Sequence, residues 1–490
     1  MRRRISMFTL VLSWAVLGCD QNPSVVSAVP RPELSADKVG TTFASADPSG
    51  QIGTVSTTGT IDLTNPFFQS LGTNGRSCGT CHLQSNAFGL SPANVQATFA
   101  ASNGADPLFA AVDGANCPTV TAADGAAGHS LLLNQGLIRI GITPPTTGVE
   151  YDITALHDPY GCAIAGSPAA VSVYRRPLPT TNLRFLSAVM FDARETVAPL
   201  NNGSTFLTNL RTDLAHQAMD ATLGHAQAAA SPTAAQLNAI VDFELALFSA
   251  QRSDNSAGVL NAQGAQGGPE PLAGVPYYPG INDPLGGNPT GAAFSPKIFS
   301  VFDAWLTLTS SNPFTAARKS IARGAVLFNS HPIAITDVTG LNDVLGVAVI
   351  PGSCGTCHDT PNVGNHSLPV PLDIGTSHVA AYETNPQIAA ALGELSTPDF
   401  PVFQVTCVSG PRTGAVSYTS DPGRALISGK CADIGRVKGP ILRGLAARAP
   451  YFHNGAAATL SQVVEFYNQR FHMGLSDQDK ADLVAFLKAL

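Results

Sequence analysis

The sequence predicts a mainly α-helical fold of two domains, with long irregular loops and little β structure. The pentapeptide C-G-T-C-H occurs twice, at residues 78–82 and 354–358, which indicates two related centres in a chain of 490 residues. Residues 460–490 place apolar side chains at helical spacing. The 46 glycines and 36 prolines favour long loops between the helices.

Each pentapeptide matches C-x-x-C-H, the attachment motif of a c-type haem. Its two thiols can bond the vinyl groups of one porphyrin, and the adjacent histidine is placed to bind the iron. A zinc ribbon takes four ligands from paired C-x-x-C units, but these pairs lie in opposite halves of the chain. A thioredoxin-like C-x-x-C does not require the histidine. We therefore predict two covalently bound haem c groups, held by Cys78, Cys81, His82, Cys354, Cys357 and His358.

Residues 1–18 are typical of an export signal. Three arginines at positions 2–4 precede a short apolar stretch at residues 7–16, which is too short to span a bilayer. The sequence Leu17-Gly18-Cys19 is similar to a lipobox and predicts a lipid anchor at Cys19, followed by a tether over residues 19–60. The alternative is ordinary secretion with an incidental cysteine. A lipid anchor and ordinary secretion both predict a location in the periplasm or cell envelope, where c-type haems are attached and disulfides persist.

Four cysteines remain after Cys19 and the two haem-binding pairs are set aside. In an oxidising compartment, four cysteines predict two disulfides, for which three pairings can be drawn. Proximity in the sequence favours Cys117–Cys162 and Cys407–Cys431, one in each half.

The formal net charge of −7 argues against binding to nucleic acid, which usually takes a basic surface. Loss of residues 1–18 would remove three arginines and make the charge more negative. An acidic protein can still dock a partner through that partner's basic patch. We expect contact with the membrane only through the lipid anchor at Cys19.

Residues 61–251 are expected to form the first domain. The Ala/Gly/Asn-rich region between the first motif and about residue 171 predicts loops with short helices. Two segments, residues 204–229 and the residues after Thr233, carry apolar side chains at helical spacing. A Gly/Pro/Asn-rich stretch then predicts a linker or insertion over residues 252–314.

Residues 315–490 are expected to form the second domain. Residues 317–328 predict a helix before the second motif, and loops follow that motif. Thr459 and Gln462 form a capping-box pair at the start of an amphipathic helix. Ser476 is placed to cap the last helix.

Together with the two C-x-x-C-H motifs, three further segments resemble the bacterial diheme cytochrome c peroxidase/MauG superfamily. They are a Pro-Thr-x-Asn segment at residues 179–182, an Asp-x-Arg at 192–194 and Pro-Tyr-Phe-His-Asn-Gly at 450–455. The resemblance covers about residues 61–250 and 315–490. It implies two mostly helical cytochrome c-like domains with a haem in each, and often a calcium ion between them.

The resemblance also implies a role for each haem. His82 would be the proximal ligand of an N-terminal, peroxide-reactive haem, and His358 that of a C-terminal relay haem. The sixth ligand of the relay haem corresponds to Tyr467, where peroxidases of the family have Met and MauG-like members have Tyr. A phenolate lowers the potential of the iron, whereas a thioether raises it. The alternative is a core tyrosine, with His472 and Met473 as reserve ligands.

The chain departs from the classical peroxidases beside the first haem. Those enzymes carry a distal histidine that blocks the iron until reduction. Thr98 stands at the position of that distal histidine, and no histidine lies between His82 and His129. The comparison with the family therefore implies an open, five-coordinate first haem.

The family uses a glutamine and a glutamate to move protons during peroxide cleavage. Gln217 matches the glutamine, but the glutamate is missing. His225 is our candidate for the acid/base because an imidazole can take up and return a proton near neutral pH. His216 is a less favoured candidate, and a purely structural role is the alternative for both histidines.

Two more departures concern the region between the haems. Phe191 replaces the family's tryptophan, and the mature chain keeps only Trp305, so electron hopping through residue 191 is doubtful. Arg448 stands where a threonine often sits, close to the backbone carbonyls that hold calcium in the family.

The resemblance implies a periplasm-side enzyme of the cytochrome-c peroxidase type. It would reduce hydrogen peroxide at the N-terminal haem, with electrons relayed through the C-terminal haem from a small cytochrome c or copper protein. One alternative is a MauG-like oxidase that modifies a partner protein. Others are a passive diheme electron-transfer cytochrome and dioxygen chemistry on an organic substrate, as in the related rubber oxygenases.

Overall fold

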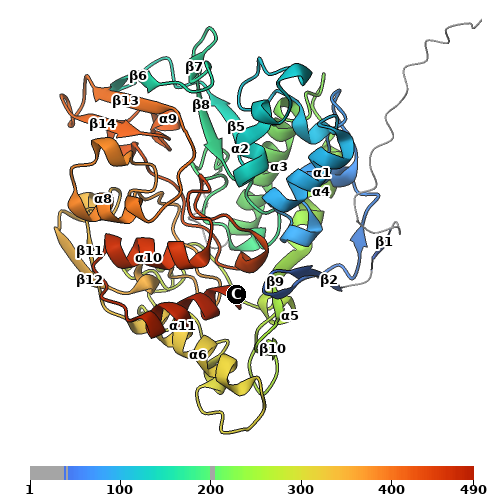
Figure 1. The fold of residues 1–490 in the computed structure, drawn as a ribbon, viewed down its shortest axis with the longest axis vertical. Helices are drawn as coiled ribbons and strands as arrows, with labels where there is room; N and C mark the ends of the chain where they lie inside the picture. Colours follow the sequence, from blue (N-terminus) through green and yellow to red (C-terminus); the bar gives the residue numbers. More distant parts are fainter. Residues whose placement is uncertain (1–37, 40–41, 199–204) are drawn as a thin grey trace, which may run out of the picture.

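The computed structural model describes residues 38–39, 42–198 and 205–490 (Figure 1). Helices hold 33% of the residues and strands 16%, distributed over several sheets. The expectation of a mainly α-helical fold with little β structure is therefore wrong. Some strands pair with strands distant in the sequence, so the sheets that they form are not predictable from local propensity.

A four-stranded antiparallel sheet joins the first described residues to the middle of the chain (Figure 1). Its order is β10-β9-β3-β2, formed by β2 (Thr42–Asp47), β3 (Gly50–Ser56), β9 (Leu247–Asp254) and β10 (Gly258–Val259). Residues 42–56, expected as part of the tether, are thus integral to the fold, because β3 pairs along its length with β9. The predicted signal peptide and Cys19 lie outside the described residues.

Two three-stranded sheets lie at the top of the view in Figure 1. One contains β5 (Ile138–Ile142), β7 (Ile164–Ala165) and β8 (Ala170–Arg175). The other contains β6 (Tyr151–His157), β13 (Val402–Cys407) and β14 (Val416–Thr419). Because β6 pairs with β13, the N-terminal and C-terminal halves share a sheet. Two small sheets are formed by β1 (Lys38–Val39) with β4 (Ile61–Asp62) and β11 (Ile333–Thr336) with β12 (Val349–Gly352).

Both predicted disulfides are confirmed. Cys117 is bonded to Cys162, and Cys407 is bonded to Cys431. Among the described residues, the cysteines outside disulfides are the four of the C-x-x-C-H motifs.

The helices of the N-terminal half are α1 (Pro92–Ser102), α2 (Ser130–Gln135), α3 (Phe206–Gly224) and α4 (Ala234–Ala246). α3 and α4 confirm the two helices predicted there, and Thr233 caps α4 as part of a capping box. α4 ends at Ala246, because Leu247 and Phe248 enter β9.

The helices of the C-terminal half are α6 (Thr315–Ser330), α7 (Asn342–Leu345), α8 (Pro386–Gly393), α9 (Ala425–Ser428), α10 (Leu460–Arg470) and α11 (Asp477–Lys488). The capping box of Thr459 with Gln462 and the N-cap at Ser476 are confirmed. α6 and α11 pack closely because Gly324 has no side chain: a Cβ there would meet the carbonyl oxygen of Asp482.

Residues 252–314, expected as a linker or insertion, pack into the core of the C-terminal half. They contain α5 (Pro269–Ala273) and three fully buried aromatic residues, Phe299, Phe302 and Trp305. The rings of Phe302 and Trp305 are stacked, and the indole N–H of Trp305 donates to the carbonyl of Ala262 at 2.9 Å. The glycines and prolines that suggested a linker therefore form turns within a packed segment.

Short 3-10 helices connect these elements: η1 (Pro66–Phe68), η2 (Cys78–Thr80), η3 (Gln84–Asn86), η4 (Pro107–Phe109), η5 (Ala122–His129), η6 (Leu183–Phe185), η7 (Asp303–Trp305), η8 (Cys354–Thr356), η9 (Ala380–Tyr382), η10 (Cys431–Asp433) and η11 (Leu445–Ala447). In the part of the chain that the structure describes, no helix combines the length and apolar character needed to cross a membrane.

Candidate haem sites

The first C-x-x-C-H motif forms a tight turn. η2 begins after Ser77, and the backbone N–H of His82 donates to the carbonyl of Cys78 at 3.0 Å. The Nδ1 atom of His82 lies 3.1 Å from the carbonyl oxygen of Phe88, so Nδ1 carries the proton and Nε2 is left as a ligand. Burial lowers the pKa of His82 to about 4, which keeps the imidazole neutral, the form that binds a metal.

The second motif repeats this arrangement. The backbone N–H of His358 donates to the carbonyl of Cys354 at 3.0 Å, and its Nδ1 lies 2.6 Å from the carbonyl oxygen of Gly364. Burial lowers the pKa of His358 to about 4 as well. In both motifs the histidine therefore bonds a carbonyl further along its own loop and keeps Nε2 for a ligand.

The cysteines of the two motifs do not form a zinc site. Cys78 and Cys81 line the first of two cavities and Cys354 and Cys357 line the second, so the two pairs do not meet as the four ligands of one zinc ion. Within the described residues, the one group of side chains close enough to hold a metal contains no cysteine.

Each motif borders its own large cavity, which we call the first cavity at His82 and the second cavity at His358. Their volumes, mouths included, are about 1440 Å³ and 1850 Å³. Two cysteines outside disulfides, a neutral imidazole and a cavity with mainly apolar walls fit one haem c at each motif.

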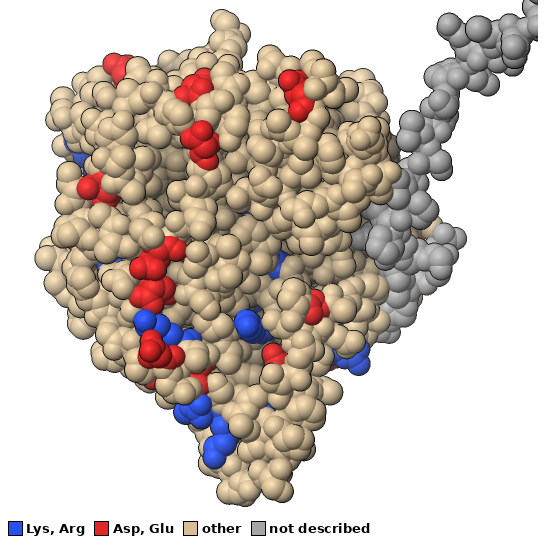
Figure 2. All heavy atoms as spheres, in the orientation of Figure 1, with Lys and Arg blue, Asp and Glu red and all other residues tan. Residues whose placement is uncertain are grey.

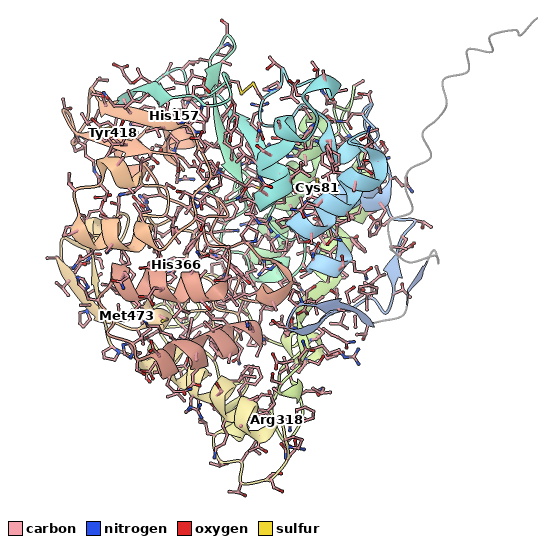
Figure 3. The ribbon with its side chains drawn as sticks, viewed as in Figure 1. Cys81, His157, Arg318, His366, Tyr418 and Met473 are labelled. Atoms are coloured by element: carbon pink, nitrogen blue, oxygen red, sulfur yellow. A yellow bond between two sulfur atoms is a disulfide. The ribbon has the colours of Figure 1, made fainter. Side chains whose placement is uncertain are left out.

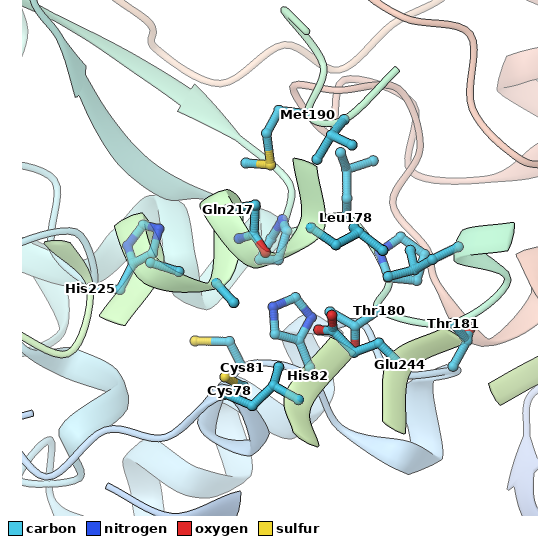
Figure 4. A pocket seen from close by; sticks show the side chains of 18 of the residues that line it. Cys78, Cys81, His82, Leu178, Thr180, Thr181, Met190, Gln217, His225 and Glu244 are labelled. Carbon is cyan, nitrogen blue, oxygen red and sulfur yellow. The ribbon is translucent and has the colours of Figure 1, made fainter. Parts of the chain in front are cut away.

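Gln217 and Met190 lie across the first cavity from His82, as Figure 4 shows. α3 carries Gln217, and His225 follows directly after the end of that helix. His225 lines the same cavity, on the side where Figure 4 places Gln217. The fold thus brings both predicted catalytic residues to the cavity of His82, and their catalytic roles remain predictions.

A buried carboxylate holds the ring of His225. Asp113 accepts a hydrogen bond from Nδ1 of His225, and its other oxygen pairs with Nη1 of Arg76. Burial alone would raise the pKa of Asp113, but the hydrogen bonds and charges of His225 and Arg76 outweigh it and hold the pKa below its usual value. With Asp113 ionised and accepting from Nδ1, Nε2 of His225 is left to exchange a proton in the cavity.

Two other residues considered from the sequence lie outside the lining of the first cavity. His216 bonds instead to Glu195, with Nδ1 2.7 Å from Oε2, and this bond raises the pKa of the imidazole. Thr98 lies within α1. Among the described residues, the histidines that line the first cavity are His82 and His225.

Four residues of the first cavity were not predicted from the sequence. Asp113 and Arg76 carry no local signal, because folding alone brings them to His225. Met190 is placed by a left-handed backbone conformation, φ 69°, and its only signal is its position before Phe191. Glu244 of α4 is buried, which raises its pKa to about 8, and its Oε2 atom has no hydrogen-bond partner.

Tyr467 of α10 lines the second cavity together with His358. Burial, and to a lesser extent the neighbouring Cys357 and Cys354, raise the pKa of its phenol. A phenolate at this position therefore depends on a nearby positive charge, such as that of an iron ion. Ligation by Tyr467 remains a prediction.

The second cavity holds other ligand types. Met473, a reserve candidate, lines it, whereas His472 does not. His366 and His453 also line the second cavity. Figure 3 shows His366 in the C-terminal half and Cys81, of the first motif, in the N-terminal half. Nε2 of His453 lies 3.2 Å from Oγ of Ser377, so this imidazole already has a partner.

The Asp-x-Arg motif belongs to a buried ionic network. Asp192 accepts hydrogen bonds from Arg175 at 2.5 Å and Arg194 at 3.1 Å, and Arg175 also bonds Asp421 at 2.6 Å and 2.9 Å. Burial opposes ionisation, but the charges of Arg175 and Arg194 lower the pKa of Asp192 to about 2. Phe191, next to this network, lines the second cavity.

The residues near the expected calcium site do not fit a calcium ion. The carbonyl oxygen of Arg448 accepts a hydrogen bond from Nη2 of Arg176 at 3.2 Å. The guanidinium of Arg448 itself donates to the carbonyls of Gly444 and Ile441 at 3.1 Å and 3.2 Å. The carbonyls that would bind a calcium ion thus face two arginines, whose positive charge repels a cation.

Comparison with known proteins identifies relatives over parts of the chain. No family model matches. A cytochrome-c peroxidase IdrP2 of Denitromonas iodatirespirans is 34% identical over 149 residues, 28% of this chain and 36% of the relative. A cytochrome-c peroxidase IdrP1 of Pseudomonas sp. (strain SCT) is 34% identical over 122 residues, 20% and 32% of the two chains. Cytochrome c551 peroxidase of Nitrosomonas europaea is 36% identical over 99 residues, 18% and 30% of the two chains. The chain therefore spans about a third of the length of these curated relatives.

A solved structure of a MauG-like protein associated with microbial copper homeostasis is 14% identical, with a TM-score of 0.33, over 87% of this chain and 88% of that chain. The two motifs, each with a free imidazole nitrogen and its own cavity, define the chain as a diheme c-type protein. Its sequence relatives over these parts of the chain are bacterial cytochrome-c peroxidases, which supports a relationship to the diheme cytochrome c peroxidase/MauG superfamily.

Proposed function

We propose that the chain is a periplasm-side diheme c-type peroxidase that reduces hydrogen peroxide to water at the haem of His82. The observation that carries this proposal is the pair of His225 and Asp113 in the same cavity as His82 and Gln217. Local identity to cytochrome-c peroxidases supports the same reaction class. Residues 61–251 would form the reactive domain and residues 315–490 the relay domain.

A haem bound at His82 would supply the redox centre for cleavage of the oxygen–oxygen bond of peroxide. His225 accepts the proton of one peroxide oxygen at Nε2 and delivers it to the other oxygen as water leaves. Asp113 holds the ring in the required tautomer through Nδ1. The amide of Gln217 hydrogen-bonds peroxide and orients it. Two electrons and two protons convert one peroxide to two waters.

The haem at His358 would pass these electrons inward from a small donor, a cytochrome c or a copper protein. Residues that line both cavities, Pro177 among them, separate the two haem sites by a common wall. Phe191 is harder to oxidise than tryptophan, so transfer by tunnelling between the haems suits this chain. Two disulfides support a location outside the cytoplasm.

The test is a steady-state peroxidase assay of the two-haem protein with reduced cytochrome c as donor, comparing wild type with His225→Gln. We expect peroxide-dependent oxidation of the donor, and in the variant a rate at least about 10²-fold lower, the usual share of an acid/base group. A wild-type protein that turns over no peroxide with any reduced donor contradicts the proposal.

A passive electron-transfer cytochrome is the second candidate, and Met190 is the observation that favours it. Its thioether lies across the first cavity from His82, and a methionine opposite a histidine is a common ligand pair of electron-transfer cytochromes. Ligation by Met190 would close the iron to peroxide. Met190→Leu would then open it, creating peroxide reactivity that the wild type lacks.

A further inference from the structure

The first and second cavities share a wall. Residues 177–179, Lys438, Pro440, Ile441 and Arg448 line both of them. Most of these side chains are apolar, so the two cations stand out. The wall is therefore the place where one side chain can act on ligands of both cavities.

Lys438 is a buried cation with a single described hydrogen-bond partner. Its side chain has 6% relative exposure, and Nζ donates to the carbonyl of Ala188 at 2.9 Å. Burial lowers its pKa to about 8, although the negative charge of Asp192 acts in the opposite direction. Asp192 is itself paired with Arg175 and Arg194, so it does not neutralise Lys438. An ammonium group has three N–H donors, and two of them remain for a ligand.

Arg448 and Arg176 add two more cationic side chains to the lining of the second cavity. Burial lowers the pKa of Arg448 to about 10 and, together with repulsion from Arg448, lowers that of Arg176 to about 9. The described partners of both guanidinium groups are backbone carbonyls, such as those of Gly444 and Gln135. Nη1 of Arg448 takes part in none of these bonds. Arg176 lines the second cavity.

Two buried cations, Lys438 and Arg176, and the half-buried Arg448 have no described carboxylate partner, which is unusual because a buried charge is costly unless an opposite charge lies beside it. The missing anions must come from a ligand of the cavities. Haem c supplies them, since its two propionates remain free when the vinyl groups are bonded to cysteine. Lysine and arginine both form strong charge-assisted hydrogen bonds with carboxylates.

We propose that Lys438 and Arg448 bind propionates of the haems attached at both motifs, with Arg176 adding a partner for the second haem. One buried wall then neutralises and positions both haems. It also accounts for the poor fit of calcium beside Arg448, since these arginines already supply the positive charge of the wall. The inference rests on haem attachment and not on peroxide turnover.

The charge of the wall has a measurable consequence. A positive charge near a haem disfavours the ferric state and raises its reduction potential. The potentials of both haems are measured by spectroelectrochemical titration of the two-haem protein, comparing wild type with Lys438→Met. We expect both midpoint potentials to fall in the variant. Lys438→Arg, which keeps the charge, should restore them, and Lys488→Met, at an exposed lysine, should leave them unchanged.

Unchanged potentials in Lys438→Met and in Arg448→Thr, with two haems per chain, overturn the proposal. If neither variant retains two haems, the propionate bending bands of the wild-type resonance Raman spectrum decide. Bands displaced by hydrogen bonding support the proposal, whereas bands at the frequency of free, hydrated propionates overturn it. Neither measurement requires peroxidase activity, so a failure of the proposed reaction is recognised separately.

Discussion

At the scale of single residues, the first cavity depends on a partner that the sequence does not reveal. Asp113 lies 112 residues from His225 in the sequence, yet its side chain fixes the imidazole. The haem-binding residues were predictable because their chemistry requires a fixed local spacing. Asp113, Arg76 and Met190 were not, because only the folded chain brings them together.

Asp113→Asn tests the role of this carboxylate. Asparagine can present its amide to His225 and favour the wrong tautomer, so we expect the peroxide rate constant to fall by about 10²-fold or more. The KM for the electron donor should stay unchanged, because the donor binds elsewhere. Stopped-flow measurement of peroxide binding to the ferric protein gives the rate. Asp152→Asn, at an exposed aspartate of β6, is the control, and equal rates in both variants would rule out a positioning role.

At the scale of secondary structure, helices were predictable and most strands were not. The capping boxes at Thr233 and Thr459 combine with apolar spacing, and both signals are local. β3 and β6 also pair with strands more than a hundred residues away, and no local pattern identifies those partners. The segment around Trp305 was likewise expected to be a linker, because its packing depends on residues that lie far away in the sequence.

Thr459→Ala tests the cap of α10, the helix that carries Tyr467. The side chain of Thr459 accepts a hydrogen bond from the backbone N–H of Gln462, and losing such a cap costs about 1 kcal/mol. Chemical denaturation followed by circular dichroism measures the free energy of unfolding. Thr459→Ser keeps the cap and should behave as wild type. A loss in Thr459→Ser equal to that in Thr459→Ala would show that the cap is not the cause.

A loop around His378 makes stability depend on pH. His378 donates to Glu383 at 2.5 Å and Asp373 at 2.9 Å, and although burial opposes protonation, these carboxylates raise its pKa to about 10. Because this folded-state value lies above the unfolded value of about 6.5, the stabilisation is complete below pH 6.5. It is lost as the pH rises from about 6.5 to 10.

We therefore expect the Tm of the wild type to fall across this alkaline range, and the fall to be smaller in His378→Gln. Differential scanning calorimetry at several pH values measures it. His157→Gln, at an exposed histidine, is the control and should follow the wild type. A parallel pH dependence in wild type and His378→Gln would show that other groups are responsible.

At the scale of the whole molecule, the two halves are joined rather than tethered. The β6–β13 pairing, the network of Arg175, Asp192 and Asp421, and the wall between the cavities all cross from one half to the other. Charged side chains are sparse and mixed on the described surface shown in Figure 2, without a broad basic patch on that face. This arrangement holds two haem sites in a fixed relation, which electron transfer between them requires.

The central claim is that the iron at His82 is open to peroxide while the iron at His358 is not. Electron paramagnetic resonance of the ferric two-haem protein, before and after addition of hydrogen peroxide, tests it directly. We expect one high-spin and one low-spin signal, with the high-spin signal lost on addition of peroxide. Two low-spin signals that peroxide leaves unchanged would contradict the claim and favour ligation by Met190 in a passive electron carrier.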